Sequence, residues 1–374
     1  MPWRIETLFE KIMKTQLRLL FAAGGTGGHI FPALAVADKC RELYPDIAIE
    51  FVGTRGRLEE KVVPRAGYRL NYLWISGFER KLSVRTMALP LKIGTSFAQA
   101  LRIMRRFRPH AVICAGAYVS YPVGMMASLS KIPLVLMESN ALPGMVIRRL
   151  APRAAEIHVA FDATMKHLNG SRVFVSGNPV RKVFFQKIDQ ARARAHFGLD
   201  ADRPTLLAFG GSLGARSINN ALDPVIGRLL ESGVQVIWQT GTSYTGGERK
   251  EPGLYRSTFI HEMEMAYAAA DLVLARAGAT TIAELAAVGK PSVLVPLPTA
   301  ADDHQRINAE AIRDSGAGAM LLDRELPEKL LPAIATLLAD GDGLQRMGNS
   351  IRRMAVPDAD ERIARRVLAL AGAD

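Results

Sequence analysis

Two glycine-rich turns, each placed between a buried strand and a helix, constrain the fold of this chain more than any other feature. The first turn is Gly24–His29, which follows the apolar run Leu17–Ala23 and precedes a helical pattern with Ile30 and Leu34 on one face. In such a strand–turn–helix, the backbone N–H groups at the start of the helix can approach a ligand closely. The turn therefore predicts the start of a Rossmann-like βαβ unit.

The same pattern returns in the second half of the chain. Pro204–Phe209 is predicted to be a buried strand, Gly210–Ala215 is the turn, and Ile218 and Leu222 recur at helical spacing. One such turn is weak evidence, but two turns at the heads of two half-chains predict a duplicated α/β architecture. A length of 374 residues suits two domains. We therefore expect two Rossmann-like domains that face a central cleft.

Further strands and helices continue this alternation along the chain. In the first half we expect strands at 47–53, 111–116 and 133–137, with a short helix at 58–66; in the second half we expect strands at 234–241, 272–275 and 291–296, with helices at 263–269 and up to Val288. Ligands bind outside the carboxyl ends of parallel strands, so His29, Tyr118, Glu138 and Asn140 should share one edge of the first sheet. Gly177–Arg181 has the turn chemistry of a linker and marks the boundary.

The two ends of the chain carry weaker signals. Met1–Lys14 mixes charges with Trp3 and Phe9 and lacks the apolar core of a secretory signal, so we expect a loose extension with Met13 as the functional start. At the other end, Pro357 should stop one helix. The pattern of Asp358 and Glu361 before Ile363, Val367 and Leu370 predicts a capped terminal helix.

Apolar runs and cysteines limit the class of protein. No run of about 18 uninterrupted apolar residues occurs, so no transmembrane helix is predicted. Cys40 and Cys114 have no metal-binding spacing, and a disulfide-free cytoplasm is the expected setting. The apolar run around Cys114 predicts that this thiol is plain core.

The net charge of +12 requires an anionic partner: nucleic acid, a membrane face or a phosphate-bearing substrate. The segment Phe78–Arg108 concentrates this charge, with apolar residues between its basic ones: Arg80, Lys81, Arg85, Lys92, Arg102, Arg105, Arg106 and Arg108. It lacks stacking aromatics and any nucleic-acid motif, so we expect no nucleic-acid partner. A basic, amphipathic segment broken at Pro90 favours a membrane interface. A solvated helix with an ordinary core side is an equally good interpretation.

A second chemical site is predicted where a helix begins at Gly278. Without a side chain there, the N–H groups of Ala279, Thr280 and Thr281 can meet a pyrophosphate. Glu284, one turn further, suits the two hydroxyls of a ribose. The pattern Thr281–Glu284 is also that of a capping box, and sequence alone leaves the two interpretations equal.

Together these motifs resemble the MurG family, whose members are UDP-N-acetylglucosamine:undecaprenyl-pyrophosphoryl-muramoyl-pentapeptide N-acetylglucosaminyltransferases of peptidoglycan synthesis. The resemblance covers the chain from Leu17 onward, and the number, order and spacing of the motifs make it specific. They are Gly-Gly-Thr-Gly-Gly-His at 24–29, Gly-Asn-Pro-Val-Arg at 177–181, Gly-Gly-Ser-Leu-Gly-Ala at 210–215, Arg-Ala-Gly-Ala at 276–279, Glu284 and Asp-His-Gln at 303–305.

The resemblance implies a GT-B fold and an inverting transfer of N-acetylglucosamine to lipid I, without cofactor or metal. It implies an acceptor and membrane domain at 1–176 and a UDP-sugar donor domain at 177–356. The helix at 357–374 would pack back on the first domain. The enzyme would be peripheral, on the cytoplasmic face of the membrane, and would bind its anionic surface.

It also implies roles for individual residues. His29 is the expected general base, with Glu138 as second choice, because an acceptor hydroxyl must lose its proton as UDP leaves. The expected substrate-binding residues include Thr26, Gly27, Gly28 and Asn140 on the sugar side of the cleft, and Tyr118 at the same sheet edge. The others belong to the donor site: Arg181, Ser212, Ile260, Ala279, Thr280, Thr281, Glu284, His304 and Gln305. Met137, Ser139, Thr280 and His304 depart from the commoner family pattern and leave the acceptor pocket less defined.

Other classes explain less of the sequence. A UDP-sugar 2-epimerase would share the fold and donor motif, as would another GT-B glycosyltransferase, and an epimerase would need no lipid-facing surface. A dinucleotide oxidoreductase would need Gly-x-Gly-x-x-Gly and an acidic residue directly after the second strand, where Gly53–Gly56 stands instead. A nucleic-acid-binding protein would explain the charge but not the paired glycine turns, and a structural protein would explain neither.

Overall fold

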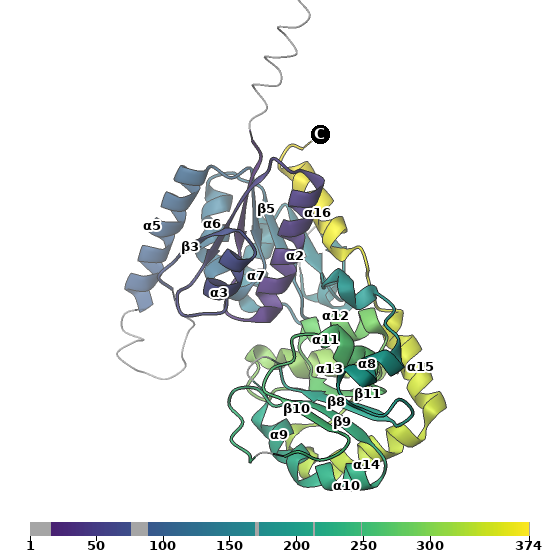
Figure 1. Ribbon diagram of the computed structural model, residues 1–374. Helices are drawn as coiled ribbons and strands as arrows, with labels where there is room; N and C mark the ends of the chain where they lie inside the picture. Colours follow the sequence, from purple (N-terminus) through teal and green to yellow (C-terminus); the bar gives the residue numbers. More distant parts are fainter. Residues whose placement is uncertain (1–15, 76–88, 169–171, 212–213, 248, 374) are drawn as a thin grey trace, which may run out of the picture. The chain divides into compact units, whose positions relative to one another are not determined.

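The computed structural model describes residues 16–75, 89–168, 172–211, 214–247 and 249–373, and it divides into two compact units (Figure 1). The first unit contains the chain up to Ser139, Pro143–Pro179 and the segment from Asp358 onward. The second contains Val180–Pro357 together with the short stretch Asn140–Leu142. Each unit has its own parallel sheet covered by helices, so the predicted α/β architecture with two Rossmann-like halves is confirmed.

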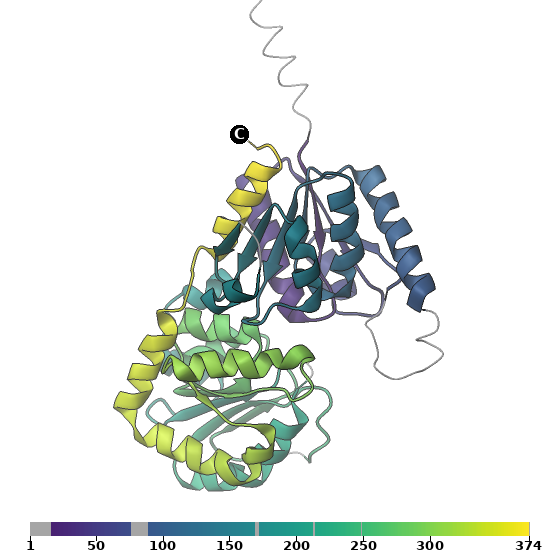
Figure 2. The same cartoon turned by 180° about the vertical axis from the view of Figure 1, so that it is seen from behind.

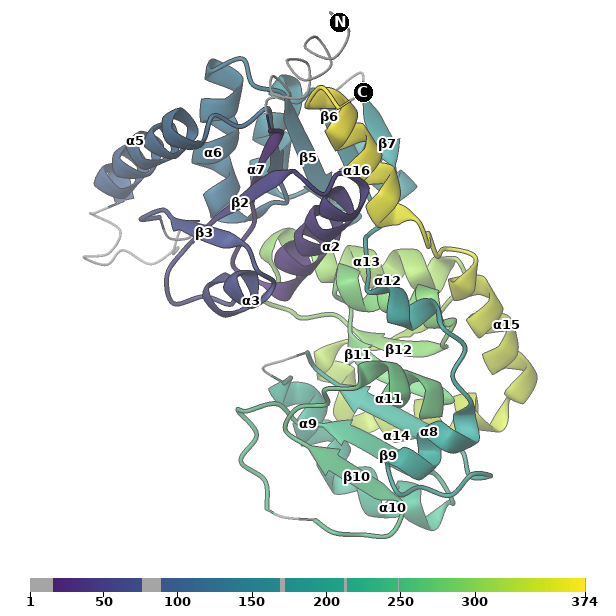
Figure 3. The same cartoon turned by 45° about the horizontal axis from the view of Figure 1, so that its top comes forward.

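The sheet of the first unit has the order β3-β2-β1-β4-β5-β6-β7 in the described residues, and every neighbouring pair is parallel. Figure 3, turned so that the top of Figure 1 comes forward, labels β2, β3, β5, β6 and β7 of this sheet. The chain reverses its direction of winding between β1 and β4, which is where doubly wound sheets bind ligands. The strands are β1 (Arg18–Ala22), β2 (Ala48–Gly53), β3 (Arg69–Tyr72), β4 (Ala111–Cys114), β5 (Leu134–Glu138), β6 (Glu156–Val159) and β7 (Val173–Val175).

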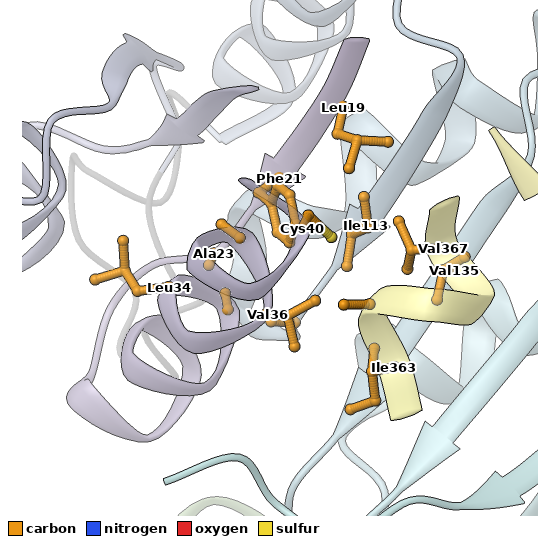
Figure 4. Packing of buried hydrophobic residues seen from close by; sticks show 14 of the residues in the cluster. Leu19, Phe21, Ala23, Leu34, Val36, Cys40, Ile113, Val135, Ile363 and Val367 are labelled. Carbon is orange, nitrogen blue, oxygen red and sulfur yellow. The ribbon is translucent and has the colours of Figure 1, made fainter. Parts of the chain in front are cut away.

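Both faces of this sheet are buried, because alternate residues of each strand enter different cores. Leu19 and Phe21 of β1 pack with helices α2 (Gly27–Leu43) and α16 (Ala359–Leu370), as Figure 4 shows. Leu20 and Ala22 belong to the core on the other face. That face is covered by α5 (Leu89–Phe107), α6 (Ala117–Leu129) and α7 (Met145–Leu150), and α3 (Glu59–Arg65) follows β2. Cys40 and Cys114 are free and fully buried in these cores, as predicted for Cys114.

The second sheet repeats this winding, with the order β10-β9-β8-β11-β12-β13 in the described residues. All its strand pairs are parallel, and the switch point lies between β8 and β11. The strands are β8 (Thr205–Phe209), β9 (Gln235–Gln239), β10 (Leu254–Ser257), β11 (Leu272–Arg276), β12 (Ser292–Val295) and β13 (Ala319–Met320).

Helices also cover both faces of the second sheet (Figure 2). Leu206 and Ala208 of β8 pack with α9 (Arg216–Leu222), α10 (Ile226–Glu231) and α14 (Leu326–Ala339). On the other face Phe209 meets the ring of Tyr267 in α11 (Met263–Ala269). The remaining helices of this unit are α8 (Gln190–His196), α12 (Ala279–Val288), α13 (His304–Asp314) and α15 (Gly341–Arg352), and short 3-10 turns connect several elements.

One local prediction about a helix end is wrong, and another is left untested. Asp358 occupies the N-cap of α16, but its side chain caps no backbone N–H and instead accepts a hydrogen bond from Arg362. Pro90 is the second residue of α5, where the missing N–H costs nothing, and the part of the basic segment before Leu89 lies outside the described residues, so the break at Pro90 stays a prediction.

Two predicted segments lie outside the described residues. One is the N-terminal extension Met1–Lys14, and the other is the first part of the basic segment, Phe78–Ala88, with Arg80, Lys81 and Arg85. In the described part of the chain, no helix is long and apolar enough to cross a membrane.

Candidate functional site

The first glycine turn joins β1 to α2 at the carboxyl edge of the first sheet. Gly25 has φ +85°, a conformation that side chains disfavour, and Thr26 is the extended N-cap of the helix. Gly27 and Gly28 open α2, so their N–H groups have no intrahelical partner. The turn therefore offers two backbone donors and the positive end of a helix dipole at the switch point.

His29 lies where this turn meets the loop after β4. Its Nδ1 is 3.2 Å from the hydroxyl of Thr26, and a Cβ on Gly116 would lie 2.9 Å from the imidazole Cδ2. Gly116 and Ala117 both have positive φ, +87° and +62°, which is strained for Ala117. The next residue, Tyr118, is 53% exposed at the start of α6. The structure thus brings the predicted His29 and Tyr118 to one edge, beside the start of a second helix.

Glu138 and Asn140, also predicted at this edge, end in different surroundings. Glu138 is the last residue of β5 and is buried, and its Oε2 accepts a hydrogen bond from the Gly144 N–H at 2.8 Å. Asn140 belongs to the second unit, where its side-chain oxygen accepts a hydrogen bond from Asn308. Asn140 is two residues beyond the end of β5, so its place at this edge stays a prediction, although its contacts group it with the second unit.

The second glycine turn, after β8, is built around close backbone packing. A Cβ on Gly214 would lie 2.1 Å from the carbonyl oxygen of Thr240, so only glycine fits there. The side-chain amide of Gln239 donates to the Gly211 carbonyl at 3.0 Å and accepts from the Ile260 N–H at 2.8 Å. Ser212 lies outside the described residues. The N–H of Ile260 is thus already engaged, so the carbonyl is the Ile260 backbone group to which the prediction of a uracil contact now applies.

Helix α12 begins at Ala279 with Gly278 as its N-cap, and this start excludes the capping-box interpretation. Thr281 lies inside the first turn instead of at the cap, so Thr281 and Glu284 cannot form that motif. The N–H groups of Ala279, Thr280 and Thr281 are those of an open helix N-terminus, as expected. Within the described part of the chain, the Thr280 hydroxyl is buried without a hydrogen-bond partner.

Glu284 lies beside the hydroxyl of Tyr267 and near Arg181. The Tyr267 hydroxyl donates to Glu284 Oε2 at 2.9 Å. Burial raises the pKa of the Glu284 carboxyl to about 7, against smaller lowering effects of the Tyr267 hydrogen bond and the Arg181 charge. Arg181 itself lies over the ring of Phe184 and pairs with Glu264 at 3.4 Å. Hydroxyl groups that donate hydrogen bonds to a carboxyl with this pKa would stabilise its ionised form.

The loop before α13 carries the remaining predicted residues. Asp302 and Asp303 both have positive φ, +50° and +55°, which is strained for residues with side chains. The side-chain oxygen of Gln305 accepts a hydrogen bond from the Leu297 N–H at 3.0 Å. This bond fixes the orientation of the amide and leaves its NH2 group able to donate. His304 is the first residue of α13.

Residues to which the sequence assigned no role hold these loops in place. Arg276, at the end of β11, pairs with both carboxylate oxygens of Asp323 and donates to the Ser217 hydroxyl. Buried Asn308 accepts from the Ala141 N–H and donates to the Ala277 carbonyl. The sequence did contain a signal for Arg276, because it is a charged residue at the end of an apolar strand. Asn308, one turn after His304, had no such signal.

Two other features bear on ligands. In the described residues, no group of three His, Cys, Asp or Glu side chains is placed to hold a metal ion.

A cavity of about 690 Å³ opens at the amino ends of β8, β11 and β12, and it is lined by none of the predicted site residues. Two cationic side chains of its lining bind the carboxyl ends of helices: Lys290 donates to the Ala270 carbonyl, and Arg352 donates to the Val288 carbonyl.

Comparison with known proteins shows the family to which this chain belongs. Residues 19–159 match the glycosyltransferase family 28 N-terminal domain, and residues 205–363 match the family 28 C-terminal domain. A UDP-N-acetylglucosamine–N-acetylmuramyl-(pentapeptide) pyrophosphoryl-undecaprenol N-acetylglucosamine transferase of Chlorobium luteolum is 44% identical over 95% of this chain and 99% of its own.

Solved structures agree with this result. The crystal structure of Acinetobacter baumannii MurG is similar with a TM-score of 0.76, at 29% identity, over 95% of this chain and all of that one. A UDP-N-acetylglucosamine 2-epimerase shares the fold at 14% identity, with a TM-score of 0.66 over 96% of this chain and 97% of its own. The predicted GT-B fold and the predicted enzyme class, a glycosyltransferase, are confirmed. The chain belongs to glycosyltransferase family 28 and, within it, to the family of the UDP-N-acetylglucosamine–N-acetylmuramyl-(pentapeptide) pyrophosphoryl-undecaprenol N-acetylglucosamine transferases.

Proposed function

We propose that this chain transfers N-acetylglucosamine from UDP-N-acetylglucosamine to the 4-hydroxyl of undecaprenyl-pyrophosphoryl-N-acetylmuramoyl-pentapeptide, lipid I. The observation that carries the proposal is the 44% identity, over almost the full length of both chains, to a transferase named for this reaction. The two glycine turns at the switch points of two parallel sheets support it, because the reaction needs one site for each of two diphosphate-bearing substrates.

The donor would bind at the N-terminus of α12. Its diphosphate would meet the N–H groups of Ala279 to Thr281, and the unpartnered Thr280 hydroxyl would gain a hydrogen bond. Glu284 would accept the ribose hydroxyls, and Arg181, Ser212 and the Ile260 backbone would contact the diphosphate and the uracil. His304 and Gln305 would contact hydroxyls of the sugar.

The acceptor would bind in the first unit, with its diphosphate at the N-termini of α2 and α6. Thr26, Gly27, Gly28 and Tyr118 line that edge, and Asn140, two residues after β5, is a further proposed substrate contact. The acceptor 4-oxygen forms its new bond to the sugar C1 as the C1–O bond to UDP breaks, so the configuration inverts. His29 would take the hydroxyl proton, with Glu138 as the second candidate, and UDP would leave with both electrons of the broken bond.

A lipid-linked acceptor requires the enzyme to work at a membrane, and we place it peripherally on the cytoplasmic face. The described part of α5 supports this location, because it presents apolar and basic groups together. Ile93 is 40% exposed, and the ammonium of Lys92 lies 5.8 Å from the ring of Trp74, which is 48% exposed. Arg102 and Arg105 are exposed further along the helix. Arg106 does not contribute, since it pairs with Glu50.

The proposal is tested by incubating the protein with labelled UDP-N-acetylglucosamine, with and without lipid I. Label should move to the lipid only when lipid I is present, and His29→Ala should abolish the transfer while leaving donor binding intact. Conversion of the donor to its 2-epimer without any lipid would favour the epimerase instead. A thermal-shift comparison of UDP-N-acetylglucosamine, UDP-glucose, UDP-N-acetylgalactosamine and NAD would report donor choice; stabilisation by NAD alone would contradict the proposal.

A further inference from the structure

A buried carboxylate that the proposed reaction does not use lies directly beneath the first glycine turn. Glu59, the first residue of α3, is fully buried. Its Oε2 accepts a hydrogen bond from the Gly25 N–H at 3.1 Å. Its Oε1 accepts from both the N–H and the hydroxyl of Thr54, at 3.0 and 2.7 Å. One side chain thus ties the loop after β1 to the loop after β2.

The surrounding glycines make room for this carboxylate. A Cβ on Gly24 would lie 2.7 Å from Glu59 Oε1, and a Cβ on Gly53 would lie 2.6 Å from its Cγ. In the described part of the chain, no cation pairs with Glu59, so hydrogen-bond donors alone stabilise the carboxylate. A buried carboxylate held in this way is costly to disturb, because removing a donor leaves part of it unsatisfied.

The hydrogen bond from Gly25 decides which amides of the turn can face a ligand. The Gly25 N–H points inward to Glu59, so it is not available to a phosphate. The N–H groups of Gly27 and Gly28, at the open end of α2, remain as the outward donors. Gly25 has a positive φ, and this conformation turns the chain between its own inward N–H and the outward N–H groups of Gly27 and Gly28.

We propose that Glu59 is a positioning residue of the acceptor site: it fixes the Gly24–Gly28 turn so that the amides of Gly27 and Gly28, and not that of Gly25, face the acceptor diphosphate. This role rests on the proposed function for the identity of the acceptor. Both oxygens of Glu59 are engaged by the protein's own loops, so neither is available to a ligand.

Glu59→Gln is the discriminating variant because it keeps the shape and removes one acceptor. The amide NH2 must face either the Gly25 N–H or the Thr54 N–H, so one backbone donor loses its partner. The matched control is Glu60→Gln on the same helical turn, because the Glu60 carboxylate is exposed and accepts a hydrogen bond from the Gly56 N–H at 2.7 Å. Thr54→Val removes the hydroxyl alone and serves if Glu59→Gln folds poorly.

The measurement is steady-state transfer at saturating UDP-N-acetylglucosamine with varied lipid I, at a temperature where every variant is folded. Glu59→Gln should raise the acceptor KM by about tenfold or more, the effect of one lost hydrogen bond to a buried charge, with a smaller change in kcat. Thr54→Val should shift KM in the same direction, and Glu60→Gln should match the wild type. The dissociation constant of the donor, measured by calorimetry, should not change in any variant.

A second readout separates this role from the reaction itself. In the ligand-free protein, amide hydrogen exchange in a peptide spanning the Gly24–Gly28 turn should be faster in Glu59→Gln than in Glu60→Gln. If the wild type transfers no sugar to lipid I, the proposed function fails, while faster exchange still supports the anchoring role. If Glu59→Gln lowers only the melting temperature, with wild-type acceptor KM and wild-type exchange in the turn, Glu59 is structural and the inference is overturned.

Discussion

At the scale of single residues, the state of Glu284 sets how the donor site responds to pH. Burial raises the pKa of its carboxyl to about 7, so the free protein holds it partly protonated near neutral pH. Ribose hydroxyls donate hydrogen bonds and stabilise the ionised form. Binding of a nucleotide sugar should therefore release a proton and strengthen as pH rises through about 7.

We predict that the affinity for UDP-N-acetylglucosamine increases between pH 6 and 8 in the wild type and stays flat in Glu284→Gln. This ligand is suitable because its diphosphate is a diester with no group that titrates in that range. At pH 8 the variant should bind more weakly by about 1.5–3 kcal/mol, the range for hydrogen bonds to charged groups. Calorimetry across the pH range is the measurement, and a parallel slope in both proteins would separate Glu284 from the ribose.

Some of these residues could be predicted from the sequence, and others could not. Gly278 and His29 follow from a local pattern, because a glycine and a polar residue at the end of an apolar strand mark a ligand edge. Glu59 and Asn308 act through loops brought near them by tertiary packing, so no local spacing reveals them. The capping-box interpretation of Glu284 failed because the helix already begins at Ala279, ahead of the residue that would have to cap it.

At the scale of elements, the predicted strands lie inside the two sheets, and the strands that were missed are the edge strands β3, β7, β10 and β13 together with the interior strand β6. β1 and β8 are continuous apolar runs because helices cover both sides. β3, β7 and β13 lie toward the edges, with partly exposed residues, so their apolar pattern is weak. These strands are held in the sheet by hydrogen bonds to the neighbouring strand, and not by a strong apolar pattern of their own.

Helix α16 is attached to the first sheet by a charge pair that links residues far apart in sequence. Arg366 donates to both oxygens of Glu156, at 2.7 and 2.6 Å, and lies 3.8 Å from the centre of the Phe174 ring. Glu156 is buried, and its Oε2 is 3.4 Å from Nε2 of buried His158. Removing the arginine would leave a buried carboxylate beside a neutral imidazole.

We predict that Arg366→Ala lowers the free energy of unfolding by about 1–3 kcal/mol at neutral pH, less than for a fully buried pair because Arg366 is half exposed. Arg365→Ala is the matched control on the same helix. Arg365 pairs with Glu361 at the surface, so its loss should cost less than about 0.5 kcal/mol. Urea denaturation of both variants is the measurement; equal effects would show that the Glu156 pair does not hold the helix.

The pH dependence of this pair sharpens the test. Burial lowers the pKa of His158 from 6.5 to about 4, so its contribution to stability is present above pH 6.5 and is lost as pH falls toward 4. The nearby Glu156 raises this pKa and Arg366 lowers it. Without Arg366, His158 should protonate more readily and pair with Glu156. The difference in stability between Arg366→Ala and wild type should therefore narrow as the pH falls from 6.5.

At the scale of the whole molecule, the positive charge and the apolar groups must be considered together. A net charge of +12 alone would fit any polyanion. On α5, however, exposed basic side chains share a helix with an exposed Ile93, and Lys92 lies against the exposed Trp74. That combination suits headgroups above an acyl layer better than nucleic acid, which would require base-stacking surfaces.

We predict that the protein sediments with vesicles in proportion to their anionic lipid content, and that salt releases it. Each well-placed basic residue contributes about 1 kcal/mol, so changing Arg80, Lys81, Arg85 and Lys92 together to Gln should abolish most binding. Ile93→Ser should weaken binding to anionic vesicles. Leu129→Ser is the matched control, because Leu129 is 69% exposed but ends a different helix, α6. Equal binding to neutral and anionic vesicles, or equal effects of the two serine variants, would place the membrane-binding surface elsewhere on the protein.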